Sequence, residues 1–211
     1  MRIAVCDVGL GNLRSVERAL HAATVGHRVD VEVTADPERV RTADRLVMPG
    51  QGAFGGCARA LAGRLGDAVR DHLGTGRPYL GICLGLQVLF GSSEESPGCA
   101  GLGVLEGEVL RLPGGIDAAT GDRLKIPHVG WNEAEPEIAH RGLLTDHAEH
   151  FYFVHSFVVV PRDPSVVAAT TEYGGARFVS AVAHENVFAC QFHPEKSQRA
   201  GIALLERFVA S

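Results

Sequence analysis

Short apolar runs alternate with helical patterns through the first half of the chain. The apolar runs are typical of strands and lie at residues 3–5, 29–33, 46–48 and 79–82. Apolar residues at helical spacing predict helices through residues 13–20, 61–73 and 84–90. Strands that alternate with helices form βαβ units, which build a mainly parallel, twisted sheet flanked by helices. We therefore expect an α/β fold with its ligand site at the carboxyl ends of the strands.

The second half of the chain shows strand patterns separated by turns. These should add antiparallel strands and lie at residues 104–112, 131–135, 151–160, 166–171 and 178–184. A short strand at 187–190 and a closing helix at 197–209 follow, with Ile202, Leu205 and Val209 facing inward. The Pro/Gly-rich residues 112–121 predict a mobile surface loop.

Length and charge limit the classes of protein that remain. At 211 residues and 45% hydrophobic content, the chain can bury one full core, so residues 1–211 are predicted to form a single domain. No apolar run reaches the roughly 18 residues of a membrane span, and the first strand is too short for a signal peptide. A net charge of −5 without a basic cluster argues against nucleic acid as the main partner.

Cysteine usage and the histidines argue against a metal or cofactor. The five cysteines are widely spread with no CxxC pair, which fits free thiols in a reducing cytoplasm. His128 and His155 have no metal-ligand companion three or four residues on, so no metal is implied. Residues 9–12 lack the glycine spacing and the lysine of a phosphate loop. We expect a cytoplasmic protein that needs no cofactor and binds no membrane.

The strongest candidate for chemistry is Cys83, in the run Gly81-Ile82-Cys83-Leu84-Gly85 between a strand and a helix. A side chain on such a turn projects from the sheet edge, and the glycines remove Cβ atoms that would clash where backbone and substrate approach. The helix that begins near Leu84 points N–H groups at the sulfur, which favours the thiolate. This pattern predicts a nucleophile elbow with cysteine in place of serine.

A second segment supplies a candidate base and acid. The strand at 187–190 delivers His193 to its end, and Pro194 stops the strand because it cannot donate a ladder hydrogen bond. Glu195 can reach the imidazole where the backbone turns, fix its tautomer and stabilise its cation. Cys83, His193 and Glu195 therefore predict a nucleophile–base–acid triad.

These segments resemble the triad-type glutamine amidotransferases, which carry Gly-x-Cys-x-Gly-x-Gln and a later His-Pro-Glu. Five blocks are similar to the glutaminase subunits of imidazole glycerol phosphate synthase: residues 9–16, 49–54, 127–132, 152–157 and 191–197. The resemblance covers essentially the whole chain, and the block at 127–132, Pro-His-x-Gly-Trp-Asn, is the discriminating one. It implies a class-I glutamine amidotransferase domain of flavodoxin-like fold.

The resemblance also implies roles in the hydrolysis of L-glutamine. Cys83 attacks the side-chain amide to form a thioester, and His193 moves the protons. Two N–H donors to the oxyanion are expected, one from Leu84 and one from a strand end. The resemblance implies that this strand end can keep a non-productive orientation until a signal comes from the partner subunit. That strand end contains Gly50, Gln51 and Gly52, and Gln51 stands where relatives often carry a small apolar residue. Glutamine-binding contacts are expected from Gln87, Ser156 and Phe157.

The implied partner is a cyclase subunit of (β/α)8-barrel type, joined in a heterodimer. By resemblance, the pair makes imidazole glycerol phosphate and aminoimidazole carboxamide ribotide for histidine biosynthesis. Ammonia is mostly protonated near neutral pH, so it must pass through a closed passage. The docking face is expected to include Asn12, as a helix N-cap on the rim, together with Pro127, His128, Trp131, Asn132 and Lys196. Lys196 is expected to pair with an acidic partner residue.

Three alternatives stay open. A glutaminase could serve another acceptor, such as anthranilate or pyridoxal phosphate synthesis, although residues 127–132 argue against this. A stand-alone peptidase or γ-glutamyl hydrolase of related fold would show strong hydrolysis by the isolated chain. A silent interaction module has no need to keep Cys83, His193 and Glu195 together.

Overall fold

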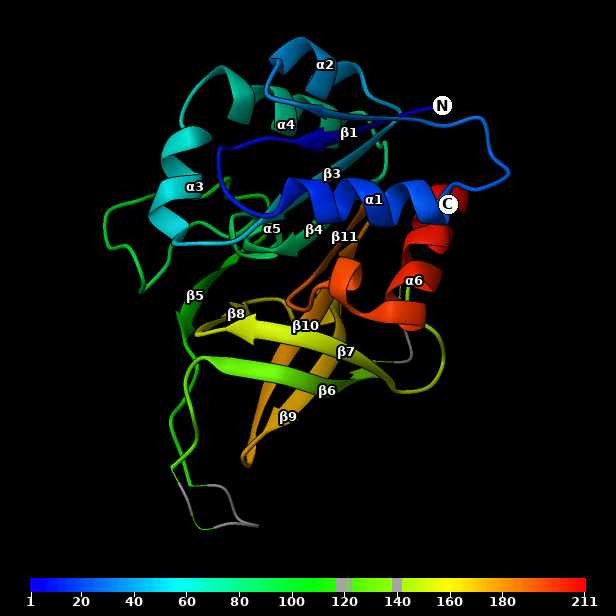
Figure 1. Ribbon diagram of the computed structural model, residues 1–211. Helices are drawn as coiled ribbons and strands as arrows, with labels where there is room; N and C mark the ends of the chain where they lie inside the picture. The colour runs from blue at the N-terminus through cyan, green and yellow to red at the C-terminus, as the bar shows by residue number, and fades with distance from the viewer. Residues whose placement is uncertain (117–120, 122, 138–141) are drawn as a thin grey trace.

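The computed structural model describes residues 1–116, 121, 123–137 and 142–211. Within this part of the chain, eleven strands form one mixed sheet flanked by helices (Figure 1). The strands are β1 Arg2–Cys6, β2 Asp30–Thr34, β3 Arg45–Gly50, β4 Tyr79–Cys83, β5 Gly107–Arg111, β6 His128–Pro136, β7 Glu149–His155, β8 Phe157–Pro161, β9 Val167–Tyr173, β10 Ala176–His184 and β11 Val187–Cys190. The helices are α1 Leu13–Ala23, α2 Pro37–Thr42, α3 Phe54–Ala60, α4 Arg64–Gly74, α5 Leu84–Gln87 and α6 Gln198–Ala210, with 3-10 turns η1 Pro164–Val166 and η2 Pro194–Lys196.

The pairing of the strands changes from parallel to antiparallel at β11. The order is β2-β1-β3-β4-β11-β10-β9-β6-β7, with β8 paired to β10 and to β5. From β2 through β4 to β11 all pairs are parallel, whereas β10 runs antiparallel to β11 and the later pairs are antiparallel too. This confirms the predicted α/β fold with antiparallel strands added in the second half. It also brings the carboxyl ends of β4 and β11 together, with Cys190 opposite Ile82.

The two faces of the parallel region bury separate apolar clusters. Alternate residues of β1 show this, since Ile3 and Val5 face the cluster under α1 and α6, while Ala4 and Cys6 face the cluster under α2, α3 and α4. Successive strand residues point to opposite faces, so a strand covered on both sides is apolar throughout. Leu205 and Val209 of α6 are buried and Ile202 packs against the same cluster, which confirms the predicted inward face.

Several predicted elements have different bounds. The helix expected through residues 61–73 is interrupted before Gly63, which caps α4, and α5 ends after a single turn at Gln87. The strand expected at 151–160 is broken at Ser156, because β7 pairs with β6 while β8 pairs with β5 and β10. The sequence analysis missed α2, although Asp36 caps it by accepting from the Glu38 N–H and Pro37 begins it.

Part of the loop predicted at 112–121 lies outside the described residues. All five cysteines are free. Among the described residues, no helix is long and apolar enough to cross a membrane.

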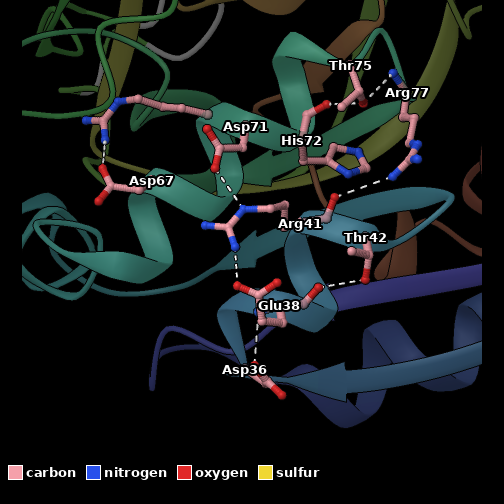
Figure 2. A network of polar contacts seen from close by, with 10 residues as sticks. Asp36, Glu38, Arg41, Thr42, Asp67, Asp71, His72, Thr75 and Arg77 are labelled. Carbon is pink, nitrogen blue, oxygen red and sulfur yellow. Dashed lines mark hydrogen bonds and ion pairs between the residues drawn. The ribbon is translucent and has the colours of Figure 1, made fainter.

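An exposed charged network ties α2 to α4 (Figure 2). The Arg41 guanidinium pairs with Glu38 on its own helix and, through Nε, with Asp71 of α4 at 2.7 Å. Arg77 donates from Nη1 to the carbonyl oxygens of Arg41 and Ala43 at 3.4 and 3.3 Å. We call this group the Arg41 network; it lies over the face of the sheet that α2 and α4 cover.

Candidate active site

The turn at Cys83 has the backbone geometry of a nucleophile elbow. Cys83 ends β4 and precedes α5, with φ 54° and ψ −101°, a conformation that an L-residue rarely adopts. A Cβ on Gly85 would overlap the carbonyl oxygen of Met48, and one on Gly81 would lie 2.5 Å from that of Gly85. The buried Tyr79 hydroxyl donates to the Gly85 carbonyl at 2.8 Å and holds the turn. Both glycines therefore make room for neighbouring backbone.

The segment after β11 fixes His193 against Glu195. The His193 N–H donates to the carbonyl of Tyr152 at 2.9 Å, and the Ser197 hydroxyl donates to the His193 carbonyl at 2.6 Å. The His193 Nδ1 lies 2.8 Å from Glu195 Oε1, and the two side chains are only 1% and 2% exposed. Since the carboxylate accepts, Nδ1 carries the proton and Nε2 is left to act on a reacting group.

The electrostatics of this pair favour a charged imidazole. Burial lowers the pKa of His193, but the nearby Cys83 sulfur and the Glu195 carboxylate outweigh burial and raise this pKa to about 10. A cationic histidine is the neighbour that a thiolate nucleophile needs. The geometry can therefore support an activated cysteine with a proton donor beside it.

A cavity of about 330 Å³ opens above the elbow. It gathers many of the predicted site residues, namely Gln51, Gly52, Cys83, Leu84, Gln87, Pro127, Ser156, Phe157 and Lys196. Gly50 lies opposite Cys83 in the β3–β4 register, and a Cβ there would come 2.7 Å from that of Leu84. A larger cavity of about 580 Å³ lies beside Tyr79, at the opposite end of β4, and contains no triad residue.

Two contacts near Cys83 were missed by the sequence analysis. Gln191 donates from Nε2 to the Cys83 sulfur at 3.4 Å, and Glu95 accepts from the Phe54 N–H at 2.6 Å at the cavity wall. Gln191 carried a usable signal, because it stands two residues before His193 at the end of a strand, where side chains share a face. Nothing in the sequence around Glu95 points to the cavity.

Gln87 is engaged within the protein rather than free in the cavity. Its Nε2 donates to the carbonyl of Phe157 at 3.2 Å and to Gln191 Oε1 at 3.1 Å. Both amide protons are therefore used, and its own Oε1 is the atom left to accept a hydrogen bond from a ligand.

The predicted docking residues lie at different depths. Asn12 is exposed and accepts from the Ser15 N–H at 3.3 Å, which is the expected N-cap bond. Trp131 is 47% exposed, and the Lys196 ammonium lies 5.8 Å from the Tyr152 ring centroid. Pro127 is exposed and Asn132 half-buried.

His128 differs from the other predicted docking residues because it is buried. Its ring stacks on Tyr173 at 4.1 Å and on Phe153 at 5.0 Å, and its Nδ1 lies 3.0 Å from the Nε2 of His155. Burial lowers the pKa of His128 to about 4 and that of His155 to about 3. The side chain of His128 therefore faces the interior and not the exposed docking surface that the resemblance implied.

Comparison with known proteins identifies the family. The family model for class-I glutamine amidotransferases matches residues 4–211, so the chain belongs to the class-I glutamine amidotransferase family and is an enzyme of that type. It is 48% identical to imidazole glycerol phosphate synthase subunit HisH of Syntrophotalea carbinolica, over 98% of each chain. It is 42% identical to the HisH subunit of Pyrococcus furiosus, over 98% of this chain and 97% of that one. Within the family the chain therefore falls among the HisH glutaminase subunits, which confirms the predicted resemblance.

Solved structures support the same fold at lower identity. A glutamine amidotransferase crystal structure superimposes with a TM-score of 0.72 at 23% identity, covering 99% of this chain and 97% of that one. PurLQS from Thermotoga maritima gives a TM-score of 0.73 at 16% identity, with the same coverage of 99% and 97%.

Proposed function

We propose that this chain hydrolyses L-glutamine through Cys83, His193 and Glu195, and passes the ammonia to a cyclase subunit that makes imidazole glycerol phosphate. The observation that carries the proposal is the Cys83 elbow, which lines the 330 Å³ cavity and has the His193–Glu195 pair beside its sulfur. The full-length similarity to HisH subunits supports the choice of acceptor over anthranilate or pyridoxal phosphate synthesis.

The proposed reaction begins with attack of the Cys83 thiolate on the side-chain amide carbon of glutamine. The carbonyl oxygen becomes an oxyanion, and His193 then gives its Nε2 proton to the leaving nitrogen as ammonia departs. The thioester that remains is hydrolysed by water, from which His193 takes a proton. The thiolate leaves, and glutamate is released. Glu195 stays ionised and keeps the imidazole oriented throughout.

The proposed oxyanion hole combines the N–H of Leu84 with an N–H from residues 50–52. Gly50 lies beside Cys83, and Gly52 has a φ of 122°, which glycine adopts readily. Both observations support a strand end that is able to reorient. A Cβ on Gly11 would lie 3.2 Å from the Gln51 nitrogen, so the loop that precedes Asn12 abuts this strand end. In this proposal, docking on the Asn12 rim is the physical trigger for the reorientation.

The test is a glutaminase assay of the chain alone and with the cyclase subunit and its acceptor ligand. An oxyanion donor acts only in the transition state, so the partner should raise kcat much more than it lowers KM. One such donor is worth roughly 2.7–4 kcal/mol, so a stimulation of at least about 100-fold is expected. Equal hydrolysis with and without the ligand-bound partner would instead favour the stand-alone hydrolase.

A further inference from the structure

A buried line of amide groups ends at the Cys83 sulfur. Gln87 donates to the Phe157 carbonyl at 3.2 Å and to Gln191 Oε1 at 3.1 Å, and Gln191 donates from Nε2 to the sulfur at 3.4 Å. Gln191 is fully buried, and its own N–H donates to the Ser180 carbonyl at 2.8 Å, which anchors it to β10. The triad mechanism gives this residue no part.

The direction of each hydrogen bond follows from the chemistry of the first acceptor. A backbone carbonyl such as that of Phe157 can only accept, so the Gln87 atom that faces it must be the amide nitrogen. That nitrogen carries two protons and donates the second to Gln191. The Gln191 atom that accepts it must therefore be the amide oxygen. The remaining Gln191 atom, which faces Cys83, is then a nitrogen donor. The network thus settles the orientation of both amides without reference to the sulfur.

Two buried histidines hold the far end of this line. The His155 Nδ1 also lies 3.0 Å from the Phe157 carbonyl, so it carries a proton and donates. Because burial keeps His155 neutral at neutral pH, its Nε2 is an acceptor and receives the Nδ1 proton of His128 at 3.0 Å. The Phe157 carbonyl is therefore fixed by two donors, and the Gln87 and Gln191 amides cannot turn over without breaking bonds.

We propose that Gln191 is a positioning residue that holds the Cys83 sulfur and donates a hydrogen bond to its thiolate form. The inference rests on the proposed function, in which that thiolate is the nucleophile. A donor to the sulfur stabilises the thiolate before attack, and again when the thiolate leaves the thioester during hydrolysis. Hydrogen bonds to charged groups are stronger than neutral ones, so the contact favours the ionised form.

The experiment compares the pH dependence of Cys83 alkylation in the full chain and its variants. Gln191→Met keeps the shape and removes the donor, whereas Gln191→Glu replaces the amide nitrogen with an oxygen. Iodoacetamide is added over a range of pH values, and the Cys83 peptide is followed by mass spectrometry. The titratable groups around this sulfur are His193, Glu195, Glu95, His155, Lys196 and Cys190; all of them are kept in each protein, and Gln191→Glu adds one carboxylate. Ser180→Ala, a buried change in the neighbouring strand, is the matched control.

We expect both Gln191 variants to raise the pH of half-maximal alkylation by about one to two pH units, since a hydrogen bond to a charged group contributes about 1.5–3 kcal/mol. Ser180→Ala should leave this midpoint unchanged. A wild-type midpoint in both folded Gln191 variants would overturn the proposal. Alkylation requires no glutaminase activity, so this result is independent of whether the proposed function holds. Labelling of wild-type Cys83 by a glutamine analogue tests that function separately.

Discussion

The amide line at Cys83 and the Arg41 network are built from similar contacts but differ in burial. Arg41 is 34% exposed and its partners Glu38 and Asp71 are 61% and 55% exposed, so water replaces any bond that breaks. Exposed pairs of this kind contribute little to stability. Gln191 has no access to water, and an unpaired buried group costs about 1–3 kcal/mol. Polar contacts therefore serve surface packing in one region and orientation of a reactive atom in the other.

The largest expected effect in the buried region comes from Cys83→Ala. Since the thioester route needs the sulfur, glutamine hydrolysis should be abolished while binding to the cyclase subunit is kept. Glutamate production and co-elution with the partner measure the two properties. Cys99→Ser, at a half-buried cysteine outside the cavity, should keep wild-type rates. Substantial turnover by Cys83→Ala would remove this cysteine from the mechanism.

The next largest effect distinguishes the role of His193 as the base from that of Glu195 as its orienting group. His193→Ala should lose on the order of 10²–10⁴ in kcat, since it removes the imidazole that Glu195 orients beside Cys83. Glu195→Gln should keep more activity, because the amide oxygen can still accept from Nδ1 in the observed geometry. Steady-state kinetics of both variants with the partner present measure the difference. Wild-type rates for His193→Ala would mean that the base lies elsewhere.

A smaller effect is expected on stability as the pH falls from about 6 to 5. His128 and His155 have pKa values lowered from 6.5 to about 4 and about 3 in the folded chain, so the unfolded chain binds protons first. Stability is therefore lost on acidification below 6.5, by up to about 1.4 kcal/mol per pH unit for each histidine. His193, whose pKa is raised to about 10, is protonated in the folded chain and mostly protonated in the unfolded chain here, so it adds little slope.

Urea denaturation at the two pH values measures this loss. His128→Phe should remove part of the slope, whereas His147→Gln, at an exposed histidine, should leave it unchanged. An identical slope in His128→Phe would contradict the assignment of a neutral buried pair.

The smallest expected effect is that of Arg41→Ala in the exposed network. Its free energy of unfolding should fall only slightly, and added salt should shrink the difference further, because surface charges are screened. Urea denaturation at low and high salt measures both. A large loss of stability that persists at high salt would show that burial is not what separates the two networks.

Local patterns were enough to predict much of the molecule. The glycine-flanked Cys83 and the strand-end His193 are each defined by neighbours in the sequence, and the alternation of strands and helices predicted the α/β fold. Gln191 was missed because its partner Cys83 lies 108 positions away in the chain. The break at Ser156 was missed because it follows from which strands β7 and β8 pair with. His128 was assigned to the surface, but rings from three other strands surround it.

The most direct test of the account is to map the covalent adduct of an electrophilic glutamine analogue. The chain is incubated with the analogue in the presence of the ligand-bound cyclase subunit, and every cysteine peptide is followed by mass spectrometry. The account predicts a single adduct on Cys83 whose formation is slowed by excess L-glutamine. An adduct on Cys6, Cys57, Cys99 or Cys190 instead, or labelling of Cys83 that L-glutamine leaves unchanged, would contradict it.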